Sequence, residues 1–226
     1  MRLQARTITQ TLGAVNPDAI IPVVVAVTVV VATLATSLVQ AKKARANLAA
    51  LGERLGLKLE TQGRYFKKHR LVGERRGKPA QILSYTTGAG KSQQRWVAVI
   101  VSVKATGGLT FSLGQRMPFS DVLARLFRKK REATGDTPFD KKWALTTNQP
   151  DFMRAALLPE MREKITQLSA RSLASGGRYK LERTEIQYAE QGSFSNAKLC
   201  ARFEEIAEIV CDLADAVEVY ADLQKN

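Results

Sequence analysis

The chain has few residues of the types that hold metals or act as nucleophile and base. Its 226 residues include only two cysteines and one histidine, His69. A tetrahedral zinc site needs clustered ligands, which one histidine and two widely spaced thiols do not make, so we do not expect one. A Gly-x-Ser-x-Gly elbow and an evident Cys/His pair are also missing. We therefore expect no catalytic residue, no cofactor and no metal, and we do not expect an enzyme.

The two cysteines, Cys200 and Cys211, lie in one C-terminal segment with a helical pattern. Along a helix they would be separated by roughly 16 Å, whereas disulfide-bonded α-carbons lie less than about 7 Å apart. We therefore expect both thiols to be reduced, which is typical of a cytosolic domain.

Two short patterns resemble functional sites but fit turns better. Residues 88–92, Gly-Ala-Gly-Lys-Ser, resemble the end of a phosphate-binding P-loop, yet Tyr85 stands where that motif needs glycine. The motif also needs a helix after it, whereas residues 93–103 have the pattern of a strand, so a hairpin turn is favoured. Asp136 and Asp140 could form a metal or acid/base site, but Asp-Thr-Pro-Phe-Asp is more simply a turn into a strand.

One long apolar run is present near the N-terminus. Residues 19–39 contain no charged side chain and lie between Asp18 and the cations Lys42, Lys43 and Arg45. A helix of this length spans about 30 Å, which matches the hydrocarbon core of a bilayer. We predict a transmembrane helix at residues 19–40, between an extramembrane segment at 1–18 and a juxtamembrane helix at 41–56.

The alternative for the same residues is a cleaved secretory signal, with residues 39–41, Val-Gln-Ala, as its small-residue exit. We favour the span, because the apolar core of a signal is usually about 7 to 15 residues long and begins closer to the initiator methionine. The Lys/Arg bias favours the cytoplasm on the C-terminal side of the run. We therefore expect a single-pass protein of the bacterial inner membrane, with its N-terminus outside and its C-terminal domain in the cytoplasm.

Positive charge is concentrated next to this run. The whole chain has a net charge of +14, residues 41–135 carry +16, and residues 194–226 carry −4. Anionic lipid attracts each nearby Lys or Arg by about 1 kcal/mol, so we expect the basic segment to contact the membrane surface. The same cations could neutralise nucleic-acid phosphates, or they could be a solvated face with ordinary positive-inside bias.

Residues 120–131 have the pattern of a short cationic amphipathic helix that could lie in the headgroup region of a bilayer. The alternative is a helix packed on the sheet with a solvated basic end. The candidate membrane-surface contacts are the cations of this segment and those beside the apolar run. They are Lys42, Lys43, Arg45, Arg125, Arg128, Lys129, Lys130 and Arg131.

Residues 57–226 have the pattern of one α+β domain. Period-two alternation and short apolar runs predict four or five strands at 57–113, and Gly107 and Gly108 predict a hairpin into the last of them. Residues 95–104 have no polar face, so we expect that strand to be buried on both sides. Further strands are expected at 139–147, 178–183 and 185–189, and helices at 150–168, restarted at Pro159, and at 195–223. The predicted fold is a mostly antiparallel sheet of about seven strands, closed by a long C-terminal helix.

The final helix repeats its strongest apolar positions in steps of four and three. These positions are Leu199, Phe203, Ile206, Val210, Leu213, Val217 and Tyr220. A repeat of 3.5 residues is typical of a coiled coil, so a homodimer through this helix is one interpretation. Smaller residues beside the repeat, such as Cys200 and Ala207, widen the stripe, and we favour packing on the sheet.

Residues 136–161 carry Phe-Asp, a tryptophan in the next expected strand, then Pro-Asp-Phe and Leu-Leu-Pro-Glu-Met. This order resembles a segment of uncharacterised bacterial single-span membrane proteins with a cytoplasmic α+β domain. The resemblance implies that architecture and transfers no functional residue. Seven or so strands closed by a C-terminal helix also resemble pleckstrin-homology-like domains, which often contact lipid headgroups or peptides, but a likeness of fold does not imply function.

These patterns together predict a membrane-anchored, non-enzymatic binding or accessory protein whose basic domain lies at the anionic membrane surface. Its expected partners are the lipid bilayer and the protein subunits of a larger membrane complex. The alternative is a membrane-tethered nucleic-acid-binding protein, indicated by Tyr65, Phe66 and Trp96 within the basic segment. We do not favour nucleic acid, because Trp96 belongs to the strand that we expect to be buried.

Overall fold

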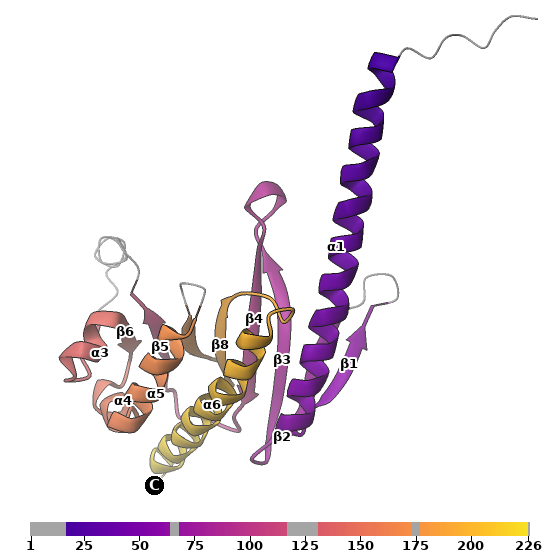
Figure 1. Ribbon diagram of the computed structural model, residues 1–226. Coiled ribbons are helices and arrows are strands. Elements are labelled where there is room, and N and C mark those ends of the chain that lie inside the picture. The colour runs from indigo at the N-terminus through magenta and orange to yellow at the C-terminus, as the bar shows by residue number, and fades with distance from the viewer. Residues whose placement is uncertain (1–16, 64–67, 117–130, 173–176, 226) are drawn as a thin grey trace, which may run out of the picture. The chain divides into compact units, whose positions relative to one another are not determined.

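The computed structural model describes residues 17–63, 68–116, 131–172 and 177–225. The chain forms two compact units, Met1–Ala41 and Lys42–Asn226. Helix α1 (Pro17–Leu55) begins in the first unit and ends in the second. The second unit combines an antiparallel sheet with helices, so the predicted α+β class is confirmed (Figure 1).

In the described residues, eight strands form one sheet in the order β1-β2-β3-β4-β8-β7-β5-β6, and every neighbouring pair is antiparallel. The strands are β1 (Lys58–Gln62), β2 (Lys68–Arg75), β3 (Lys78–Thr87), β4 (Gln94–Ser102), β5 (Phe111–Gln115), β6 (Trp143–Thr147), β7 (Arg178–Glu182) and β8 (Glu185–Gln191). The helices after α1 are α3 (Thr137–Lys142), α4 (Pro150–Ala156), α5 (Pro159–Ala170) and α6 (Ala197–Leu223). The sheet therefore has one strand more than we predicted, whereas the helix break at Pro159 and the long final helix are confirmed.

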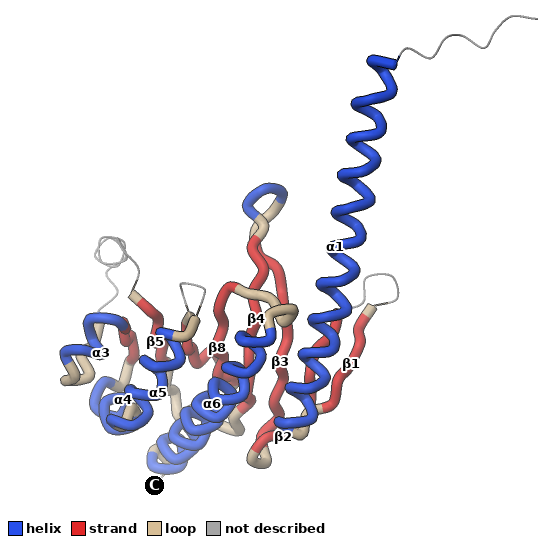
Figure 2. The backbone as a smooth tube through the Cα atoms, viewed as in Figure 1, coloured by secondary structure: helices blue, strands red, loops and turns tan. Residues whose placement is uncertain are grey.

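The helices of the second unit lie on one face of the sheet, in front of the strands in Figure 2. On β4, Val97, Val99 and Val101 are at most 1 % exposed. Trp96 and Ile100 alternate with them on the opposite face and are partly exposed, so the prediction that this strand is buried on both sides is wrong for these two residues. The pattern misleads because the opposite face is partly apolar although none of the described helices covers it.

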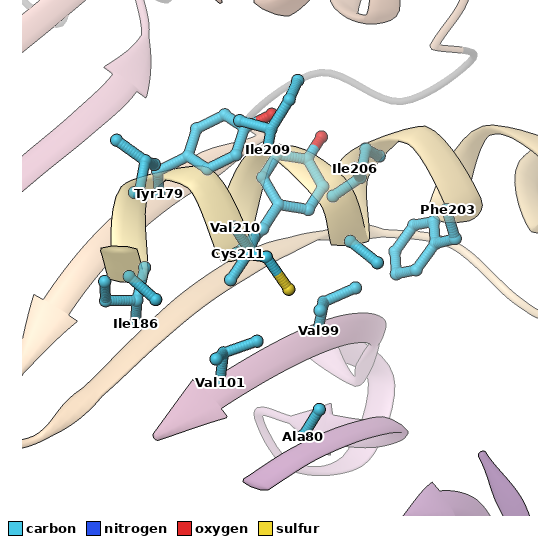
Figure 3. Close-up of a cluster of buried hydrophobic side chains, with 14 of the residues drawn as sticks. Ala80, Val99, Val101, Tyr179, Ile186, Phe203, Ile206, Ile209, Val210 and Cys211 are labelled. Atoms are coloured by element: carbon cyan, nitrogen blue, oxygen red, sulfur yellow. The ribbon is translucent and has the colours of Figure 1, made fainter. Parts of the chain in front are cut away.

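Helix α6 provides much of the core. Its seven positions with the 3.5-residue repeat are all at most 8 % exposed, and Figure 3 shows Cys211 of this helix pointing toward Val99 and Val101. The side chain of Asn196 caps the helix by accepting hydrogen bonds from the backbone N–H groups of Lys198 and Leu199. Packing of the stripe on the sheet is therefore confirmed. A homodimer through this helix stays a prediction, and it would have to use other positions.

The predicted hairpin at Gly107 and Gly108 is wrong. Strand β4 pairs with β3 and β8, while β5 pairs with β6 and β7, so the chain crosses two strands between β4 and β5. The edge of β4 is taken by the β7–β8 hairpin, whose Thr184 carbonyl accepts a hydrogen bond from the N–H of Val103 at 2.8 Å. The glycines still form a turn, with φ of +55° and +77°.

The predicted strand at residues 139–147 begins too early. Residues up to Lys142 form α3, because the side chain of Asp136 accepts from the backbone N–H of Phe139 at 3.1 Å and Pro138 occupies the first helical turn. Only Trp143–Thr147 is extended, as β6. The aspartate two residues before this proline therefore starts a helix, and not a strand.

Helix α1 has two kinds of environment along its length. Its last turns are part of the second unit, where Leu48, Leu51 and Leu55 are at most 2 % exposed. The helix ends at Leu55, and Gly56 directly after it has a φ of +69°. In the first unit, Leu38 is 70 % exposed. The core of the second unit therefore includes the end of the helix that begins in the first.

We expect Leu51→Ala to lower the free energy of unfolding of the full chain in mild detergent by about 2 to 5 kcal/mol, because it leaves a cavity in a closed core. Leu38→Ala is the matched control on the same helix and should leave that free energy unchanged. Urea unfolding followed by circular dichroism measures both. Equal effects of the two substitutions would show that the end of α1 is not part of the core.

Candidate functional site

The candidate membrane-surface residues fall in different places. Lys42, Lys43 and Arg45 are exposed on α1, where the second unit begins. Arg131 is partly buried, and burial together with the nearby charge of Arg116 lowers its pKa. Outside the described residues lie Arg125, Arg128, Lys129 and Lys130.

Cations of the basic segment pair with the acidic face of α6. The turn between β2 and β3 carries Arg75, Arg76 and Lys78, which contact four carboxylates on this helix. We call these seven residues the charge cluster, and its carboxylates belong to Glu208, Asp212, Asp215 and Glu218. Arg76 donates to Asp212 Oδ1 and to Glu208 Oε2, each at 2.6 Å. The opposite charges of residues 41–135 and 194–226 therefore meet inside one unit.

Two carboxylates of the charge cluster are easier to ionise than usual. Burial opposes the charge of Glu208, but hydrogen bonds from Arg75 and Arg76 outweigh it and hold the Glu208 pKa below its ordinary value. Burial of Glu218 is likewise outweighed by the backbone N–H of Lys104 and the ammonium of Lys78, so its pKa is also lowered. Both carboxylates stay charged at a lower pH in the folded chain than in the unfolded chain.

A cavity of about 910 Å³ lies where α5 and β8 end and α6 begins, and we call it the polar cavity because most of the residues that line it are polar or charged. Part of its wall is an ion pair between Arg202 and Glu190, whose side chains are 5 % and 0 % exposed. Glu190 also accepts from the hydroxyls of Tyr188 at 2.7 Å and Ser172 at 3.2 Å, and Arg202 donates to the Leu168 carbonyl at 3.1 Å. Since each charge is paired and hydrogen-bonded, this network holds α6 to β8 and α5 and presents little net charge to the cavity.

A second hollow lies on the face of the sheet opposite the helices, and we call it the open-face cleft. It has a volume of about 400 Å³ and is lined by residues of β3, β4, β5, β7 and β8. Tyr85 and Trp96 stand at one end, and Arg178 and Lys180 at the other. Aromatic rings and cations around one hollow are suited to binding a ligand. Of the five charged residues that line the polar cavity, four are paired with one another, as Arg171–Glu205 and Arg202–Glu190.

The other candidates from the sequence have structural roles. Cys200 and Cys211 are free and buried, and burial raises the pKa of each thiol to about 11. Residues 88–92 form the turn of the β3–β4 hairpin, as we predicted. Asp136 caps α3, while Asp140 accepts hydrogen bonds from the backbone and hydroxyl of Thr134. Within the described ranges, no three His, Cys, Asp or Glu side chains are grouped so that they could hold a metal ion.

Sequence reasoning missed both the polar cavity and the open-face cleft. One signal for the buried ion pair was present: Arg202 lies three residues after Leu199 and four before Ile206, on the apolar stripe of the final helix. A charge at such a position indicates a buried partner. No comparable signal exists for the cleft, because it depends on which strands are neighbours in the sheet.

Comparison with known proteins gives no relative. No family model, no curated protein and no solved structure matches this chain. Its function therefore has to be argued from the geometry alone.

We expect acid to destabilise the chain partly through Glu208. A carboxylate with a lowered folded pKa stabilises the fold above its unfolded pKa of about 4.5, and this stabilisation is lost as the pH falls through the folded pKa. Urea midpoints between pH 6 and pH 3 should therefore fall less steeply for Glu208→Gln than for the parent chain. Glu53→Gln, at an exposed position on α1, is the control and should retain the parent slope. Parallel slopes for all three proteins would contradict the assignment.

We expect Glu190→Gln to lower the free energy of unfolding by about 3 to 5 kcal/mol, because it leaves Arg202 buried without a counter-charge. The double variant Glu190→Gln/Arg202→Met should recover most of this loss, and a double-mutant cycle on urea unfolding measures the coupling. The nearby pair Arg171–Glu205 has side chains 52 % and 54 % exposed, so Glu205→Gln should cost no more than about 1 kcal/mol. Equal costs at the two sites would show that the buried pair has no special role.

Proposed function

We propose that this chain is a membrane-anchored, non-enzymatic binding or accessory protein. The observation that carries the proposal is the exposure of the apolar part of α1. Its large apolar side chains from Val25 to Val39 are between 52 % and 70 % exposed, whereas Leu48, Leu51 and Leu55 of the same helix are buried. A helix of a soluble core would bury such residues within the chain, so this surface needs an apolar medium from outside.

A signal sequence is the competing explanation for one apolar helix near the N-terminus. The backbone of α1 is helical without interruption from Pro17 to Leu55, and so it is helical through the small-residue exit at Ala41. Proteases prefer exposed, irregular segments, and a helix that continues into a packed core offers none at that point. We therefore favour an anchor that stays attached to the domain.

The cations after the apolar segment support the orientation that we propose. Lys42, Lys43 and Arg45 are exposed within the first turns after the span, where the positive-inside bias acts most strongly. With the apolar segment in a bilayer, their side chains would be at the depth of anionic headgroups and would contact lipid directly. The proposed location is the bacterial inner membrane, with the domain in the cytoplasm. The apolar face of α1 could also pack on helices of a larger membrane complex.

Nucleic acid stays the second candidate. Trp96 is partly exposed, which removes one objection, while Tyr65 and Phe66 lie outside the described residues. Against this candidate, the cations of the charge cluster already have carboxylate partners. A phosphate backbone would have to displace those carboxylates before it gained the same contacts.

We expect the triple variant Lys42→Gln, Lys43→Gln and Arg45→Gln to lose its uniform orientation, because it removes the charge bias beside the span. The measurement is labelling of intact cells with a membrane-impermeant maleimide, using Thr9→Cys or Gln224→Cys as the reporter. The native cysteines are buried and should not react. In the parent chain only Thr9→Cys should be labelled, whereas in the triple variant Gln224→Cys should be labelled in part of the molecules.

The matched control removes three exposed cations that are distant from the span in the sequence: Lys141→Gln, Lys142→Gln and Lys198→Gln. This control should keep the parent labelling pattern. Labelling of Gln224→Cys in the parent chain would refute the orientation. Recovery of the intact chain in the soluble fraction without detergent would refute the anchor itself.

A further inference from the structure

The open-face cleft exists because small residues lie at its floor. The small residues that line it are Ala189 of β8, Gly114 of β5 and Gly177. In the register of the sheet, Ala189 is opposite Arg178 of β7, and Arg178 is opposite Gly114. Side chains in neighbouring rows are longer, so the floor is lower than its rim. All these residues are on the face of the sheet away from α6, so the described helices do not cover them.

One end of the cleft is aromatic. Tyr85 and Trp96 are directly opposite each other on β3 and β4. The indole Nε1 of Trp96 donates to the Thr87 hydroxyl at 2.9 Å, and Gln187 Nε2 donates to the Tyr85 hydroxyl at 3.4 Å. These hydrogen bonds fix both ring systems in place. A partly exposed, fixed indole is a surface on which a planar ring can stack.

The other end of the cleft is cationic. The Arg178 side chain lies over Gly114, with its Nε 3.2 Å from the point where a Cβ on that glycine would be. Within the described residues Arg178 has no acidic partner, whereas the neighbouring Lys180 is paired with Glu182 at 2.7 Å. Arg178 is therefore the cation available at this end, and a guanidinium is well suited to hold a phosphate or carboxylate through two hydrogen bonds.

The geometry points to a nucleotide as the ligand of the open-face cleft, with its base stacked on Trp96 and its phosphate held by Arg178. Strands β4 and β7, which carry Trp96 and Arg178, are separated by β8 alone, so the two ends of the cleft are about 10 Å apart across the strands. An extended nucleotide also carries its base and its phosphate at opposite ends. Charge complementarity and the two different ends of the cleft both favour this class over a purely apolar ligand.

The amides between the two ends fit a base as well. Gln191 Nε2 donates to Gln94 Oε1 at 2.8 Å, and the amide of Gln187 faces Tyr85. In each case the side-chain oxygen of Gln191 or Gln187 can still accept a hydrogen bond from the edge of a base. This inference goes beyond the proposed anchoring function and does not depend on it, because every residue involved lies in the second unit.

Trp96 can report binding by itself, since the chain has only one other tryptophan. Trp143 is 2 % exposed, and its indole nitrogen has no hydrogen-bond partner among the described atoms, so Trp143→Phe should be tolerated. The experiment titrates the full-length Trp143→Phe chain, in non-ionic detergent, with adenosine monophosphate. We expect saturable quenching of the Trp96 fluorescence. Inorganic phosphate alone should not quench it, and adenosine should do so only weakly.

Arg178→Gln should weaken the binding of adenosine monophosphate by about tenfold and leave the weak binding of adenosine unchanged. Arg95→Gln is the matched control, because Arg95 is next to Trp96 in sequence but on the other face of the sheet. Binding that is equally reduced by both substitutions would overturn the site, since it would indicate general attraction to a basic chain. Absence of quenching at millimolar concentration would also overturn it.

A second arm distinguishes the source of the nucleotide, which is either a free molecule or a unit of a single strand. An oligothymidylate that binds more tightly than the mononucleotide, and loses this affinity in Arg178→Gln but not in Arg95→Gln, supports the cleft as a contact for a single strand. Mononucleotide binding without this gain supports a free nucleotide. An oligonucleotide that binds regardless of Arg178 overturns the proposed site.

Discussion

Helix α6 is the element on which the second unit depends, because it satisfies two opposite requirements. Its inner stripe is buried against β4 and β8, and burial of apolar side chains is the main favourable term in folding. Its outer stripe carries carboxylates at helical spacing, which would repel one another without partners. Arg75, Arg76 and Lys78 are those partners. Since they come from the turn between β2 and β3, the ion pairs also hold the β1–β2–β3 part of the sheet to the helix.

Because of this pairing, the uneven charge along the sequence cannot all be assigned to contact with an outside partner. A positive excess beside an apolar run is typical of contact with anionic lipid, yet part of that excess is matched by the final helix of the same chain. Interactions between exposed charges are screened beyond about 10 Å at moderate salt. For the proposed anchor, the cations to test against a bilayer are therefore those nearest the apolar segment, Lys42, Lys43 and Arg45, because the net charge of the whole domain includes cations that are already paired.

The sequence predicts best what is local. The periodicity of the final helix, the restart at Pro159 and the strands at 178–183 and 185–189 all follow from residues close together in the chain, and the structure confirms them. Gly107 and Gly108 predict a turn correctly but not its partner strand, because β8 follows β4 by more than eighty residues and still takes its edge. The membrane-surface residues were predicted from charge alone, and the open-face cleft could not be predicted, since it exists only through strand order.

A sheet that helices cover on one face still has a second face, whose side chains are exposed to solvent. On β4 the uncovered side carries Trp96 and Ile100, which are both partly exposed, beside a fully buried Ala98. The residues at the centre of that face are small, so the surface is recessed there. Arg178 adds a charge without an acidic partner in the described residues. Exposed aromatic area is unfavourable in water, whereas an exposed guanidinium stays solvated and can pair with an anion, so this face has the composition that the proposed nucleotide would need.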